Sequence, residues 1–185
     1  RNLLAKLTSA DLSNEAFPFG TAQEIEIGYG NALALRMTYV GELGWEIYAA
    51  TEFAQDIYDK IIEVGSNYGL QLAGMHALNS LRLEKAFRHW GHDIADEDTP
   101  LEAGLEFAVK FDKPGGFIGR DALLRQKEKV LKSKNTVLKK RLVQFALENP
   151  EPLLYHNEPI WCNDKIVGDL TSGMYGHTIG TCLGM

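Results

Sequence analysis

Between residues 22 and 49, apolar and polar residues alternate in short runs that glycines separate. The runs cover residues 22–27, 32–40 and 45–49, and each places apolar side chains at every second position. This period of two is typical of a strand with one buried and one exposed face. The breaks between the runs hold the residues that permit tight turns, namely Gly28, Gly30, Gly41 and Gly44. The segment therefore predicts three short strands.

A change to helical periodicity follows these strands. Thr51 is a suitable N-cap, and apolar residues then recur at helical spacing as far as Gly65 or Gly69. Residues 75–87 and 117–131 predict two more helices, and residues 70–73 and 105–111 predict strands. Residues 90–105 are rich in Gly, Asp and Pro and predict a long loop. This order favours an α+β fold with an antiparallel sheet and helices on one face.

Beyond residue 141 the pattern contains strands only. Residues 142–147, 158–162 and 165–171 alternate, with turn residues between them. A small β-barrel that the given sequence does not complete is the natural interpretation. We therefore expect an α+β domain over residues 1–132 and a β-barrel domain over residues 133–185, both belonging to a longer polypeptide.

Charge and composition narrow the classes of partner. The chain of 185 residues carries a net charge of −6, which disfavours binding to nucleic acid or to an anionic membrane. No secretory signal pattern is present at the start, so we expect a bacterial cytoplasmic or mitochondrial matrix location. Residues 125–141 are strongly basic, which favours a solvated linker or helix face over a site for a polyanion.

Several familiar motifs do not fit. Gly28 and Gly30 lack the third glycine and the following helix of a dinucleotide-binding loop. His89, His92 and Asp93 have a spacing that a metal site could use, but histidines in a loop more often bind backbone groups. We therefore expect no metal site.

Five segments resemble the glycine-cleavage T-protein (aminomethyltransferase) family, in the family's order. The first is an Arg-x-x-Tyr-x-Gly-Glu-x-Gly-Trp-Glu motif that runs from Arg36 to Glu46. The others contain Ser-Leu-Arg-Leu-Glu-Lys (80–85), Trp-Gly-His-Asp (90–93) with Thr-Pro-Leu-Glu-Ala-Gly (99–104), Phe-Ile-Gly-Arg-Asp-Ala-Leu (117–123), and Gly-Asp-Leu-Thr-Ser-Gly (168–173). Together they cover nearly the whole chain. The resemblance implies the T-protein fold, in which the first domain is ferredoxin-like.

The run Glu-Lys-Ala-Phe-Arg-His-Trp-Gly, residues 84–91, is most similar to the subgroup of sarcosine and dimethylglycine dehydrogenases. The resemblance implies a tetrahydrofolate-binding domain for one-carbon transfer, linked to an N-terminal flavin domain whose FAD oxidises an N-methyl amine. Two alternatives remain open: a stand-alone aminomethyltransferase or demethylase, and a non-catalytic regulatory subunit of the same fold. Whether the chain takes part in catalysis is therefore open as well.

The resemblance also implies site residues. The family's glutamate for the pterin ring corresponds to Glu46, and a carboxylate suits the paired N–H donors of that ring. Tyr39 and Trp45 are candidates to line the folate cavity. The family's catalytic aspartate lies upstream of Arg1, so the catalytic residue is unknown. Leu78 replaces an arginine that in T-protein meets the glutamate tail of folate, so this contact is lost or comes from another cation.

Overall fold

The computed structural model describes residues 1–132 and 138–185. Backbone contacts divide the chain into two compact units, Arg1–Asn79 and Ser80–Met185. A search of the described residues found no helix that is long and apolar enough to cross a membrane.

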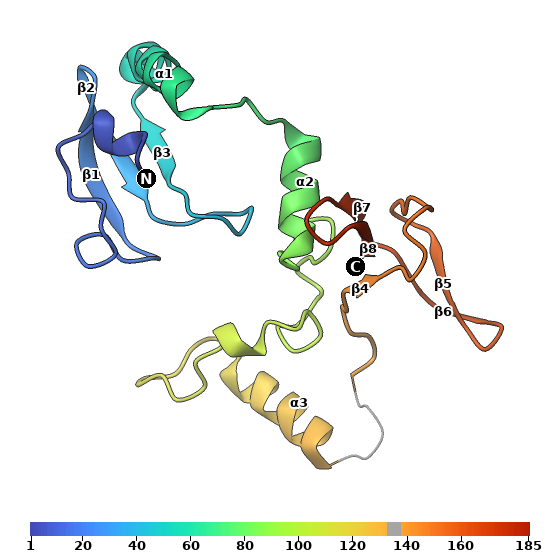
Figure 1. The fold of residues 1–185 in the computed structure, drawn as a ribbon. Helices are drawn as coiled ribbons and strands as arrows, with labels where there is room; N and C mark the ends of the chain where they lie inside the picture. The colour runs from blue at the N-terminus through green and yellow to red at the C-terminus, as the bar shows by residue number, and fades with distance from the viewer. Residues whose placement is uncertain (133–137) are drawn as a thin grey trace. The chain divides into compact units, whose positions relative to one another are not determined.

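The first unit contains an antiparallel sheet of three strands, in the order β1 (Ala22–Ile27), β2 (Gly30–Leu35) and β3 (Glu46–Ala49). Figure 1 shows these strands in blue to cyan. All three predicted strands are present, although β2 ends at Leu35 and not at residue 40. The Arg36 backbone N–H still donates to the Thr21 carbonyl, and from residue 37 to residue 45 the chain has no strand partner and forms turns and bends.

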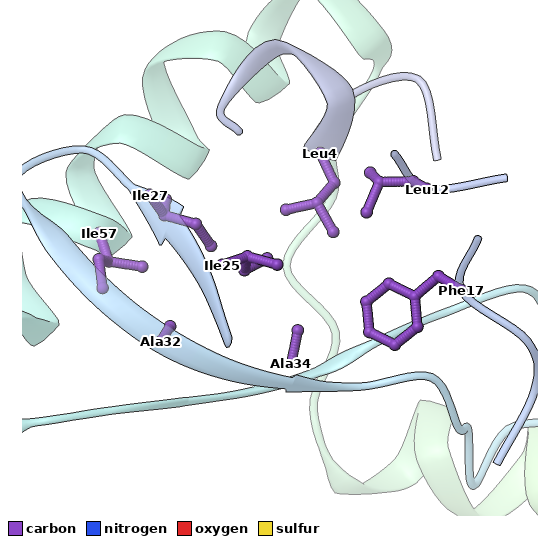
Figure 2. Packing of buried hydrophobic residues seen from close by; sticks show 8 residues of the cluster. All are labelled: Leu4, Leu12, Phe17, Ile25, Ile27, Ala32, Ala34 and Ile57. Carbon is purple, nitrogen blue, oxygen red and sulfur yellow. The ribbon is translucent and has the colours of Figure 1, made fainter. Parts of the chain in front are cut away.

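The two faces of this sheet differ. The inner face is buried and carries Ile25, Ile27, Ala32 and Ala34. Helix α1 (Thr51–Gly65) packs on it through Ile57, as do the 3₁₀ turn η1 (Leu4–Lys6) and the loop that follows it. Figure 2 shows these side chains meeting from β1, β2, α1 and the N-terminal segment. The outer face stays open, so the prediction of a helix on one face of the sheet holds for α1.

The turn between β1 and β2 is hydrogen bonded to α1 and packs against it. The Tyr29 backbone N–H donates to Asp56 Oδ2 at 2.8 Å. Gly28 has a φ of +61°, which L side chains rarely adopt. A Cβ at Gly30 would lie 2.6 Å from the Phe53 side chain. The two glycines of this turn are therefore explained by helix packing.

Two strand predictions in the middle of the chain are wrong. After the 3₁₀ turn η2 (Ser66–Tyr68), residues 70–73 have no strand partner, and the Leu72 side chain is exposed. Residues 105–111 contain a 3₁₀ turn, η3 (Glu106–Ala108), and Phe107 is 84% exposed. An apolar run becomes a strand only when a neighbouring strand supplies its hydrogen bonds, and neither run has one. The helix predictions hold for α2 (Met75–Glu84) and α3 (Arg120–Lys132).

The last part of the second unit consists of strands. β4 (Phe145–Ala146), β8 (Thr181–Gly184) and β7 (Gly173–Gly176) form one antiparallel sheet, and β5 (Pro159–Cys162) pairs with β6 (Lys165–Asp169) in another. The described strands therefore do not close into a barrel. Leu83 at the end of α2 packs on Leu183 and Met185 and forms the buried core of these strands.

The basic segment is only partly described. Lys127 pairs with Glu106 at 2.6 Å, and Lys132 pairs with Glu128 at 3.4 Å. Helix α3 has no buried residue, which agrees with a solvated helix face. Residues 133–137, where the predicted domain boundary falls, lie outside the described residues, and that boundary stays a prediction.

The packing of α1 on the first turn gives a testable prediction. Gly30→Ala should lower the free energy of unfolding by about 1–3 kcal/mol, because the new methyl group overpacks against Phe53. Urea unfolding followed by circular dichroism measures this. Gly74→Ala is the matched control, since nothing lies within 4 Å of a Cβ there. Equal effects at both positions would contradict the packing argument.

Candidate functional site

The predicted ligand carboxylate lies on the open face of the first sheet. Glu46 begins β3 and pairs in register with Leu35 of β2, while Tyr48 pairs with Leu33. Paired residues share a face, so these four side chains are neighbours on the outer face. Leu33 is 43% exposed and Tyr48 is 55% exposed. A half-buried carboxylate therefore stands beside accessible apolar surface.

Glu46 has one hydrogen-bond partner on this face. The Tyr48 hydroxyl donates to Glu46 Oε2 at 2.8 Å. This hydrogen bond, followed by the negative charge of the carboxylate, raises the pKa of Tyr48 above its usual value. The phenol is therefore protonated and a donor at neutral pH. The sequence contained a signal for this pair, since residues two apart on a strand share a face.

Trp45 precedes Glu46 and faces the other way. Its ring packs against the inner core, where it meets Phe17 edge-on at 6.2 Å between ring centroids. The Arg36 guanidinium lies 5.1 Å from the centre of the same ring. The indole N–H is buried and has no acceptor among the described residues. Trp45 therefore supports the strand from behind and keeps one unused donor.

Arg36 holds the chain before the motif in place. Its guanidinium donates to the Phe17 carbonyl at 2.7 Å and to Asn14 Oδ1 at 2.9 Å, and the residue is buried. The first residue of the motif therefore has a structural role, since it links the end of β2 to the segment before β1. Tyr39 is half-buried in the turns that connect β2 to β3.

An open depression of about 650 Å³ lies elsewhere in the first unit. It is lined by residues of the N-terminus, of the strand connections and of the segment after α1, among them Arg1, Asn14, Arg36, Leu43 and Tyr68. Glu46, Tyr39 and Trp45 do not line it. The predicted site residues thus lie outside this depression.

A second polar cluster lies inside the second unit. Arg82 Nη1 donates to Asp93 Oδ2 at 2.5 Å, and both side chains are almost fully buried, with 3% and 0% exposed. Arg82 Nη2 donates to Ser172 Oγ at 2.7 Å. The hydroxyls of Thr171 and Ser172 donate to Asp93 Oδ1 at 2.7 and 2.5 Å. Three segments that are distant in sequence are thereby joined through one carboxylate.

The ionised form of Asp93 is favoured. Burial by itself would raise the pKa of Asp93, but donors from Ser172, Thr171 and the His89 backbone, together with the Arg82 charge, lower that pKa below its usual value. A buried carboxylate with this many donors is satisfied in its charged form. The cluster therefore contains an ion pair between the Arg82 guanidinium and the ionised Asp93 carboxylate.

Two predictions about cations and metals bear on this cluster. The Arg82 guanidinium is already bound to Asp93 and Ser172. Its side chain is therefore not placed to substitute for the arginine that T-protein has at the position of Leu78. Asp93 is likewise occupied, and no group of three His, Cys, Asp or Glu side chains in the described part of the chain could hold a metal ion. The neighbouring His89 and His92 rings lie 5.7 Å apart, centroid to centroid.

Comparison with known sequences assigns the family. The profile of the GCVT N-terminal domain matches residues 1–113, and that of the glycine cleavage T-protein C-terminal barrel domain matches residues 140–185. The chain therefore belongs to the glycine cleavage T-protein family, which confirms the predicted resemblance.

Two relatives illustrate the subgroup. The chain is 46% identical over its whole length to a 4-methylaminobutanoate oxidase (formaldehyde-forming) of Paenarthrobacter nicotinovorans, and covers 22% of that protein. It is 44% identical, over 97% of its length, to the mitochondrial dimethylglycine dehydrogenase of Homo sapiens, and covers 20% of that protein. The chain thus spans about a fifth of each relative.

A solved structure supports the fold. The glycine cleavage system aminomethyltransferase T of Bartonella henselae superposes with a TM-score of 0.78 and 23% sequence identity, over 99% of this chain and 47% of that one. The α+β architecture with antiparallel sheets is therefore that of the T-protein. The ferredoxin-like description of the first domain stays a prediction.

The buried ion pair gives a second prediction. Asp93→Asn should lower the free energy of unfolding by about 3–5 kcal/mol, because the Arg82 charge would stay buried without its counter-charge. Chemical unfolding of the chain measures the change. Asp96→Asn, three residues away on the exposed surface, should change it by no more than about 0.5 kcal/mol. A small loss at Asp93 would show that the pair is not buried.

The same group gives a pH prediction. Because the folded-state pKa of Asp93 is lowered, its stabilisation is fully present above the unfolded pKa of about 3.9 and is lost as the pH falls through the folded value. The wild-type chain should therefore lose more stability than Asp93→Asn on acidification below pH about 4. Unfolding curves measured from pH 6 to pH 2.5 test this. Parallel pH profiles for the two proteins would contradict it.

Proposed function

We propose that this chain is the tetrahydrofolate-binding part of a larger one-carbon-transfer protein, with Glu46 as the carboxylate that recognises the pterin ring. The observation that carries the proposal is the placement of Glu46 on the open face of β3, beside Leu33 and Leu35. Family membership supports it, because the family motif brings a glutamate to this position.

The chemistry of the ligand fits these side chains. A pterin ring is flat and presents two adjacent N–H donors, which one carboxylate accepts as a bidentate pair. The ring faces need apolar contact, which the exposed surfaces of Leu33 and Tyr48 offer. Tyr39 from the preceding turns is proposed to line the same site. Trp45 is proposed to support the site from the inner face, where its packing on Phe17 fixes the start of β3.

The relatives suggest which one-carbon unit is involved. One of them is named as an oxidase of a methylamino compound that forms formaldehyde, and the other as a dehydrogenase of dimethylglycine. Oxidation of an N-methyl group releases carbon at the oxidation level of formaldehyde. Bound tetrahydrofolate would supply the nucleophilic nitrogens that accept this carbon. We therefore propose an N-methyl amine as the substrate of the whole protein.

Oxidation of the amine is assigned to a flavin domain outside this chain. The proposal rests on the relatives, which are about five times as long as the chain. The turn at Gly28 connects two strands and is therefore not a dinucleotide-binding loop. The role of this chain is therefore to bind and orient the folate.

Tetrahydrofolate binding tests the proposal. In the complete protein that carries this chain, Glu46→Gln should weaken binding of tetrahydrofolate by about 1.5–3 kcal/mol, because a charged acceptor of two hydrogen bonds is lost. Isothermal titration calorimetry under anaerobic conditions measures the affinity.

Glu24→Gln is the matched control, since Glu24 lies on the same open face of the sheet and pairs with Leu33 from β1. Its affinity should equal that of the wild type. No binding by the wild-type protein would favour the regulatory subunit, and an unchanged affinity in Glu46→Gln would assign pterin recognition to another residue.

A further inference from the structure

Tyr48 lies beyond the family motif that ends at Glu46, and its hydroxyl has no assigned role. Its side chain is 55% exposed, yet its hydroxyl makes a direct hydrogen bond of 2.8 Å to Glu46 Oε2. The structure describes no other hydrogen-bond partner for this hydroxyl. The one recorded polar contact of this exposed tyrosine is therefore with the candidate ligand carboxylate. This contact points to a role in ligand binding as well as in folding.

We propose that Tyr48 is a positioning residue that fixes the orientation of the Glu46 carboxylate for bidentate recognition of a planar ligand with two adjacent N–H donors. This inference rests on the proposed function, because it specifies how the same site achieves its affinity. It assigns to Tyr48 no contact with the reacting atoms.

The argument starts from the flexibility of glutamate. A glutamate side chain has three rotatable bonds, and its terminal torsion has a broad minimum, so the plane of a free carboxylate is poorly defined. Bidentate pairing requires one particular plane, and holding a long side chain in one geometry costs entropy on binding. A hydrogen bond from Tyr48 to Oε2 restricts that torsion before the ligand arrives. The strand positions of Glu46 and Tyr48 supply the required proximity.

The hydrogen bond also leaves room for the ligand. An ionised carboxylate has about four acceptor positions, two on each oxygen. Tyr48 uses one position on Oε2, so Oε2 can accept one further N–H and Oε1 can accept another. The described residues place no recorded hydrogen-bond donor on Oε1. The arrangement is therefore compatible with two N–H donors side by side.

The competing explanation is a local strand pair without a role in binding. Side chains two apart on an exposed strand face often touch, and such a contact changes stability little. The two explanations differ in one measurable respect. A local pair leaves ligand affinity unchanged, whereas a positioning residue affects affinity only through Glu46.

A double-mutant cycle separates them. Tetrahydrofolate affinity is measured by calorimetry for the complete protein as wild type, Tyr48→Phe, Glu46→Ala and the double variant. Phenylalanine removes only the hydroxyl of an exposed side chain, and alanine removes the acceptor. We expect Tyr48→Phe to weaken binding about three- to tenfold, the effect of one hydrogen bond. In the Glu46→Ala background the same change should have no effect.

Each outcome decides a different statement. Unchanged affinity in Tyr48→Phe, with weaker binding in Glu46→Ala, would overturn the positioning role and leave the proposed function standing. An equal loss from Tyr48→Phe in both backgrounds would also overturn it, because Tyr48 would then act independently of Glu46. Unchanged affinity in Glu46→Ala would overturn the proposed function and the positioning role together. Tyr58→Phe, an exposed tyrosine on α1, is the control and should bind as the wild type does.

A measurement without ligand gives independent support. The pKa of Tyr48 is raised by Glu46, so the Tyr48 phenol should titrate at higher pH in the wild type than in Glu46→Ala. Nuclear magnetic resonance of ring-labelled tyrosine, with the signal assigned through Tyr48→Phe, follows this titration. Identical titration curves would show that the hydrogen bond does not form in solution and would overturn the inference.

Discussion

The pleat of β3 determines which side chains of the first unit point to the buried face of the sheet and which to the open face. Successive side chains of a strand point to opposite faces, so the adjacent Trp45 and Glu46 have different surroundings. Trp45 goes inward, onto Phe17 and Arg36, and anchors the start of the strand. Glu46 is thereby directed outward, to the face that α1 does not cover. A shift of one residue in register would exchange them and bury the carboxylate.

The second unit depends on a buried ion pair. Arg82 from α2, Asp93 from the long loop, and Thr171 with Ser172 near the chain's end meet around one carboxylate. Burying a charge is costly unless it is fully paired, so such a group tolerates little change in its partners. This explains why three of the family segments contain these residue types. Their shared role is to join an α-helix, a loop and a strand connection.

Much of the architecture was predictable from local patterns. The alternation of residues 22–27 and 45–49 and the helical spacing after Thr51 gave the sheet and α1, because these elements have a neighbour that satisfies their backbone. The same alternation failed at residues 105–111, where Phe107 is exposed and no strand lies alongside. Periodicity shows which face of an element is apolar, but it does not show whether a partner is present. The described strands beyond residue 141 form no closed barrel, and the prediction was of a barrel that the given sequence does not complete.

The sequence by itself determined the family, through five segments in order, and with it the expectation that Glu46 recognises a pterin. These conclusions depend on residue identities and spacing, which a chain carries without folding. Only the tertiary structure decided that Trp45 packs inward and that Arg82 is committed to Asp93. Both are contacts between residues that lie apart in the sequence, Trp45 with Phe17 and Arg82 with Asp93. They depend on register and packing, which local sequence patterns do not specify.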